Sequence, residues 1–299
     1  MSNRSRILVG IPTRDRLDYL TILLFSLLEQ DVGFDVLIVN TSTRSEGGIA
    51  FEPDSPISRI SKTLYALGSN VECKSVSVVG YSETVAVNAI LECAVERGYG
   101  YVFKVDDDHW IPSGTLKRFK TLIQKLDPKF EAPVVVSGVT PWMEPAYSGG
   151  AGPDDIAQGD PEEPVTYLER HDEAKTVTAI VNHFVRYPPE YCDPDKSLRE
   201  THLASAANFM MRPDTRILWS DTCSRSMYCD AAWFIQLRKL LGYRLYFDLG
   251  VNVWHVAAPS GGCRAGENGM LKTDGDNVKR AKFVYQLLKQ FEWREKKCT

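Results

Sequence analysis

Three adjacent carboxylates follow a short apolar segment in YVFKVDDDHWIP, residues 101–112. Asp106, Asp107 and Asp108 repel one another, so this segment needs a positive partner. The spacing of Asp106 and Asp108, with one residue between them, suits a hard divalent cation such as Mg²⁺ or Mn²⁺, which takes oxygen ligands and keeps positions free for phosphates. The alternative interpretation is an acidic turn whose aspartates cap the next helix.

Apolar strand-like segments alternate with amphipathic helical segments in the first half of the chain. Strands are predicted at residues 6–13, 34–42, 71–80 and 101–105, and helices at residues 16–30 and 82–98. The alternation predicts an α/β fold with a mostly parallel sheet and helices on both faces. Ligands of such sheets bind at the carboxyl ends of strands, which is where the three aspartates stand.

The second half is less regular. Residues 144–164 are rich in Gly, Pro and acidic residues and are predicted to form a long loop. Ordered structure is expected to return at 176–187 and 205–213, a strand is predicted at 243–257, and helices are predicted at 230–242 and 276–297. The last helix has a basic end that favours a solvated surface, although it could also lie on an anionic lipid or a nucleic-acid backbone.

Composition excludes some classes of protein. The formal net charge of -4 at pH 7 argues against a general nucleic-acid coat. The longest apolar run, residues 20–28, is about half the length of a membrane span, so we expect none. The seven cysteines include no C-x-x-C pair, which predicts reduced thiols in a cytoplasmic protein rather than a zinc site or disulfide framework.

Six segments, in order along the chain, resemble motifs of the family 2 glycosyltransferases. They lie within residues 5–258 and read VGIPTRDRLDYL, VLIVNTST, VAVNAILECA, VDDDHWIP, SAANFMMRP and YCDAAWFIQLRKLLGYRLYFDLGVNVWH. The resemblance implies a GT-A fold, with a Rossmann-like, mostly parallel sheet and a smaller sheet on the acceptor side. It implies an inverting transferase of hexosyltransferase type that moves a sugar from a nucleoside diphosphate to an acceptor hydroxyl and depends on Mn²⁺ or Mg²⁺.

The same resemblance divides the chain by role. Residues 1–110 would form the half that binds the nucleotide sugar, and residues 111–258 the acceptor-binding and catalytic half. Residues 259–299 would add the basic C-terminal helix and a flexible Gly-rich loop, which is either a lid that closes over the diphosphate or a plain surface turn.

The resemblance also assigns metal ligands. Asp108 would bind the metal that bridges the diphosphate, Asp106 would contact the metal or the ribose, and His255 would supply a third ligand. Asp107 belongs to the nucleotide-binding segment but is expected to face the other way, because neighbouring strand residues point to opposite sides. His109 follows the motif and could touch the substrate.

Further nucleotide contacts follow from the resemblance. The expected binding residues are Pro12, Thr13, Arg14, Asn40 and Asn88. Asn40 stands where the family commonly has an aspartate, and its amide can still donate to and accept from a base. A second arginine of the first motif, at position 16, could pair with phosphate as Arg14 could. The donor expected first is a UDP-sugar.

Asp230 stands where the family has its general base, which takes the proton of the acceptor hydroxyl. The residue before it is Cys229 instead of the usual acid, and Asp221 is the alternative base. Asp230 also fits the N-cap of the predicted helix, and the two roles can coexist.

The acceptor stays open. A carbohydrate is expected first, and a lipid-linked intermediate, a protein or modified DNA are alternatives. A nucleotidyltransferase would also use paired acids and metal, but it predicts a Gly-rich phosphate loop, and GIPTRDR has a single glycine. A non-catalytic carbohydrate-binding module predicts the loss of metal or base acids, which are present here.

Overall fold

A computed structural model describes residues 3–14, 16–41, 55–76, 83–129, 131, 133–139, 198–201, 204–219 and 229–255. Several predicted segments lie outside the described residues: the loop at 144–164, the ordered segment at 176–187, the Gly-rich segment and the C-terminal helix. Asp221 also lies outside them.

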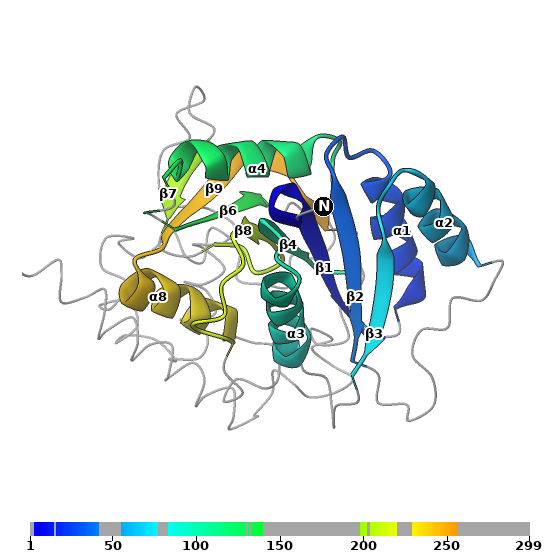
Figure 1. Ribbon diagram of the computed structural model, residues 1–299, viewed down its shortest axis with the longest axis horizontal. Helices are drawn as coiled ribbons and strands as arrows, with labels where there is room; N and C mark the ends of the chain where they lie inside the picture. Colours follow the sequence, from blue (N-terminus) through cyan, green and yellow to red (C-terminus); the bar gives the residue numbers. More distant parts are fainter. Residues whose placement is uncertain are drawn as a thin grey trace, which may run out of the picture.

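One mixed sheet of eight strands, ordered β3-β2-β1-β4-β8-β6-β9-β7, forms the centre of the molecule (Figure 1). Its strands are β1 Ile7–Thr13, β2 Phe34–Asn40, β3 Val71–Ser75, β4 Tyr101–Val105, β6 Val134–Val139, β7 Leu198–Thr201, β8 Asn208–Met211 and β9 Arg244–Asn252. The pairings β1–β2, β1–β4, β2–β3 and β6–β9 are parallel. Strand β8 is antiparallel to β4 and β6, and β7 is antiparallel to β9.

Helices cover both faces of this sheet. They are α1 Leu17–Leu27, α2 Pro56–Ala66, α3 Glu83–Glu96, α4 Thr115–Leu126 and α8 Cys229–Leu241, and a 3₁₀ turn, η1 Asn3–Ser5, precedes β1. The buried side chains form two clusters, one under α3 and α8 and the other under α1, α2 and α4. Successive residues of β1 alternate between the clusters, with Leu8 in the first and Ile7 and Val9 in the second. The predicted α/β fold with two covered faces is confirmed.

A close contact fixes α3 on the sheet. A Cβ added at Gly10, in the middle of β1, would overlap the side chain of Ile90 on α3. The helix therefore packs on β1 at a distance that only glycine permits. This packing places the first turn of α3 near the carboxyl ends of β1 and β4.

Asp35 ties the amino ends of four strands together. It is buried at the start of β2 and accepts hydrogen bonds from Arg6 Nε at 2.9 Å, the Asn70 amide at 2.8 Å and the Tyr99 hydroxyl at 3.0 Å. Arg6 and Asn70 immediately precede β1 and β3, and Tyr99 lies two residues before the start of β4. This polar cluster lies at the amino ends of the strands, and the three aspartates lie at the opposite, carboxyl ends.

A second, two-stranded sheet joins β5 His109–Trp110 to β10 Trp254–His255. The predicted single strand at 243–257 is thus two strands, β9 and β10. The pairing is antiparallel and sets His255 opposite His109. Within the described part of the chain, no helix is long and apolar enough to cross a bilayer.

Candidate functional site

The carboxyl ends of β1, β2 and β4 lie at the same end of the sheet, because these strands are parallel. Thr13 ends β1 opposite Asn40 at the end of β2, and both residues are buried. The Thr41 amide donates to the Thr13 carbonyl at 2.9 Å, which holds the two strand ends together. Strand β4 ends at Val105, so the carboxylates that follow lie at this same edge.

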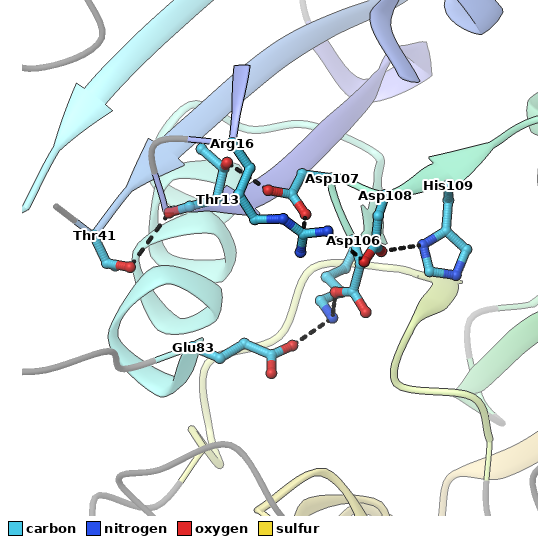
Figure 2. Close-up of polar contacts among 9 residues, drawn as sticks. Thr13, Arg16, Thr41, Glu83, Asp106, Asp107, Asp108 and His109 are labelled. Carbon is cyan, nitrogen blue, oxygen red and sulfur yellow. Dashed lines mark hydrogen bonds and ion pairs between the residues drawn. The ribbon is translucent and has the colours of Figure 1, made fainter. Parts of the chain in front are cut away.

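Arg16 is a positive partner of the carboxylates (Figure 2). Its guanidinium forms ion pairs with Asp107 Oδ1 at 3.0 Å and with Asp108 Oδ2 at 2.8 Å. The Thr13 hydroxyl donates to Asp107 Oδ2 at 2.6 Å. Asp107 was expected to face away from its neighbours, because adjacent residues of a strand point to opposite sides. The three aspartates instead follow the end of β4, and Asp107 and Asp108 both contact the guanidinium of Arg16.

The carboxyl of Asp107 has a raised pKa. Burial raises the pKa of its carboxyl to about 7, assisted by the neighbouring charge of Asp108 and opposed by Arg16 and the Thr13 hydrogen bond. Because burial is the main cause, the raised pKa reflects chiefly the removal of this carboxylate from water.

Lys104 is the partner of Asp106. Its side chain is 1% exposed, although it belongs to the apolar strand β4. The ammonium forms an ion pair with Asp106, donates to Glu83 Oε1 at 2.6 Å and donates to the Ala206 carbonyl at 2.6 Å. Burial alone would lower the pKa of Lys104, but the carboxylates of Asp106 and Glu83 outweigh it and raise the pKa above its ordinary value. Lys104 therefore stays charged and holds Asp106 against the first turn of α3.

Three side chains could hold a cation. One potential ligand atom from each of Asp106, Asp108 and His109 lies within 4.8 Å of the others. Asp108 Oδ1 is 3.1 Å from His109 Nδ1, and both side chains are almost fully buried. Two carboxylate oxygens and one imidazole nitrogen fit a divalent ion such as Mn²⁺. The backbone of His255 lies opposite that of His109, because β10 pairs with β5.

The remaining predicted nucleotide contacts occupy two places. Pro12, Thr13 and Asn40 lie at the strand ends beside the carboxylates, and Arg14 follows them as an exposed residue. Asn88 instead braces the protein: its amide donates to the Trp219 carbonyl at 3.0 Å and accepts from the Trp219 amide at 2.8 Å. This contact fixes α3 to the segment after β8.

The second residue of α8 is Asp230, the predicted general base. The predicted helix at 230–242 is therefore confirmed, and α8 packs on the same face of the sheet as α3.

Sequence reasoning undervalued three residues of this site. His109 was expected only as a possible substrate contact, and Glu83 was not expected to belong to the site. The signal for the third was visible, because a lysine inside the apolar strand YVFKV requires buried counter-charges. Its partner Glu83 could not be assigned without the packing of α3 on β4.

No family model matches the sequence, and no curated protein matches it. Among solved structures, the crystal structure of S. aureus TarS is similar, with a TM-score of 0.52 and 12% sequence identity. The match covers 96% of this chain and 40% of the TarS chain, so this chain spans less than half of that protein. TarS is a family 2-type glycosyltransferase. At this identity the likeness establishes the fold, which is of the GT-A type.

Proposed function

We propose that this protein is a glycosyltransferase that transfers a sugar from a nucleoside-diphosphate sugar to an acceptor hydroxyl. The observation that carries the proposal is the cluster of Asp106, Asp108 and His109 at the carboxyl edge of a GT-A-type sheet. This is the edge at which open α/β sheets bind nucleotides. The fold likeness to TarS supports the same class of reaction.

In the donor site, Asp108 and His109 bind a divalent cation, with Asp106 as a further ligand or a ribose contact. His255 is proposed as an additional ligand on the basis of its register with His109. The bound Mn²⁺ or Mg²⁺ supplies positive charge for the departing nucleoside diphosphate. Thr13, Asn40 and the backbone around Pro12 line the strand ends beside the cation, where the nucleoside is expected.

Asp230 is proposed as the general base. A base at the acceptor hydroxyl makes the oxygen a better nucleophile as it attacks the anomeric carbon, and direct displacement inverts that carbon. The first turn of α8 is a suitable origin, since the helix fixes the backbone of this residue independently of the donor-side strands. Acceptor classes remain those that the sequence suggests, with a carbohydrate first.

Turnover of a panel of UDP-, GDP- and dTDP-sugars, with and without Mn²⁺, tests the proposal. We expect one donor to be consumed in a metal-dependent reaction, by transfer or by slow hydrolysis. Asp31→Asn is a suitable control, because it removes one carboxylate from an exposed pair with Lys117, away from the site. A complete absence of both turnover and metal-dependent binding across the panel would refute the enzyme assignment.

A further inference from the structure

Arg16 and the proposed cation need the same carboxylate. Asp108 uses Oδ2 for the guanidinium of Arg16 at 2.8 Å and faces His109 with Oδ1 at 3.1 Å. A cation bound between Asp108 and His109 would therefore lie within a few ångströms of the guanidinium charge. Two positive charges that close together in a buried site repel each other strongly. Binding of either one therefore weakens the hold of the other on Asp108.

Arg16 can leave Asp108 without leaving the site. Its side chain is 25% exposed, whereas those of Asp107 and Asp108 are 5% and 4% exposed. The other guanidinium nitrogen stays on Asp107, which the Thr13 hydroxyl holds in place. The guanidinium also lies over the Tyr19 ring, with its carbon 4.7 Å from the ring centroid. Of the two ion pairs that Arg16 forms, the one with Asp108 can therefore break while the guanidinium stays in place.

We propose that Arg16 is a resident counter-ion that exchanges partners when the donor binds. This inference rests on the proposed function. Arg16 releases Asp108, which then binds the metal. The other guanidinium nitrogen stays on Asp107, and the released nitrogen donates a hydrogen bond to the donor diphosphate, which must lie beside the same cation. Asp107 is thereby a positioning residue for Arg16, which gives the third carboxylate of the motif a role distinct from those of Asp106 and Asp108.

A purely structural role of Arg16, in which it only orients Asp108, predicts the opposite effect on metal affinity. If Arg16 only oriented Asp108 as a ligand, its removal would weaken metal binding, as loss of an orienting partner generally does. A resident counter-ion competes with the metal, so its removal strengthens metal binding. The sign of the change in Mn²⁺ affinity therefore distinguishes the two roles.

The experiment titrates the whole chain with Mn²⁺ alone, following free Mn²⁺ by electron paramagnetic resonance. Arg16→Gln should bind Mn²⁺ at least about fivefold more tightly than wild type, because a competing charge-assisted hydrogen bond is gone. Arg16→Lys keeps the charge but lacks the two-pronged fork, so its affinity should fall between the two. Arg59→Gln removes an exposed arginine of α2 and should leave the affinity unchanged.

A second titration adds UDP at saturating Mn²⁺. Here Arg16→Gln should bind UDP about tenfold more weakly than wild type, since a guanidinium contact to the diphosphate is lost. Tighter Mn²⁺ binding together with weaker UDP binding supports the exchange. Unchanged or weaker Mn²⁺ binding by Arg16→Gln overturns the exchange alone, whereas failure of every variant and of wild type to bind Mn²⁺ overturns it together with the metal-dependent function.

Discussion

A single buried cation determines where the first carboxylate of the motif lies. Lys104 holds Asp106 and Glu83 and also donates to the Ala206 carbonyl, and its side chain is 1% exposed. Removal of one member of such a buried ion pair leaves the others uncompensated. The positions of Asp106 and of the first turn of α3 are thus coupled through one residue.

Lys104→Met should lower the free energy of unfolding by about 3 kcal/mol, because two partly buried carboxylates lose their counter-charge. Urea denaturation at pH 7 measures the change. Lys117→Met is the matched control, since it removes the same type of residue from an exposed ion pair with Asp31, and we expect no measurable loss there. Equal losses in the two variants would contradict the structural role of Lys104.

Asp230→Asn should reduce donor turnover by roughly 10²- to 10⁴-fold, the usual contribution of a general base. The Kd for the nucleoside diphosphate should stay the same, because the donor side is built from β1, β2 and β4. Turnover rate and Kd are measured on the same preparation. A turnover rate equal to that of wild type would remove Asp230 from the mechanism.

The parts of the site formed by adjacent residues were the most predictable from the sequence. The D-x-D spacing and the strand before it predicted a carboxylate cluster at a sheet edge, and that is where Asp106, Asp107 and Asp108 lie. The partnership of Arg16 with two of them could not be predicted, because it depends on the register between the turn after β1 and the end of β4. The bracing contact of Asn88 on Trp219 likewise joins residues remote in sequence.

At the scale of elements, the two ends of the sheet use aspartate differently. Asp35 at the amino ends is satisfied by Arg6, Asn70 and Tyr99. Burial alone would raise the pKa of Asp35, but the hydrogen bonds from these partners outweigh burial and hold its pKa below the usual range. Asp35 at the amino end is therefore stabilised in its charged form, whereas at the carboxyl end burial raises the pKa of Asp107.

Asp35→Asn should destabilise the protein at pH 7 by about 2–3 kcal/mol, through the loss of charge-assisted hydrogen bonds. Because the pKa of Asp35 is lower in the folded state, its stabilisation is complete above about pH 4 and is lost as the pH falls through the folded-state value. The stability gap between wild type and variant should therefore shrink in acid. Urea unfolding curves at several pH values test this, and a gap that widens in acid would contradict it.

Gly10→Ala should destabilise the protein by about 1–3 kcal/mol, because the new methyl group overlaps Ile90 and pushes α3 from β1. Adding Ile90→Ala makes room, so the double variant should lose less than the sum of the two single changes. Gly33→Ala is the control, since the nearest atom to its added Cβ is 3.6 Å away. Strict additivity in thermal or urea unfolding would show that the helix does not pack as described.

Among the helices of the described residues, α1, α3 and α8 were predicted from the sequence and α2 and α4 were not. The helices predicted at 16–30, 82–98 and 230–242 correspond to α1, α3 and α8, whereas α4 was not predicted although it is strongly amphipathic. Helix α2 was not predicted, although Ser55 caps it, Pro56 begins it and Gly68 follows it with φ 88°. The short strand β5 has no local signal, since it exists only by pairing with β10.

At the scale of the whole molecule, one continuous sheet joins two parts of the chain. The strands before residue 110, β1 to β4, occupy one half of the sheet, and β6 to β9 occupy the other. Strand β8 connects them through antiparallel pairs with β4 and β6. The strand order depends on contacts between distant segments, so the alternation of elements could predict the fold class but not this order.

Because the sheet is continuous, ligand binding at its carboxyl edge should stabilise the molecule as a unit. A ligand present at 100 times its Kd adds about 2.7 kcal/mol to the stability of the native state. The most direct test of the central claim is therefore thermal unfolding with Mn²⁺ and a nucleoside diphosphate, in wild type, Asp108→Asn and Asp31→Asn. We expect one nucleotide to raise the Tm only when Mn²⁺ is present, in wild type and Asp31→Asn but not in Asp108→Asn. A nucleotide-dependent rise that Asp108→Asn retains, or no rise with any nucleotide, would contradict a metal-dependent donor site at the three aspartates.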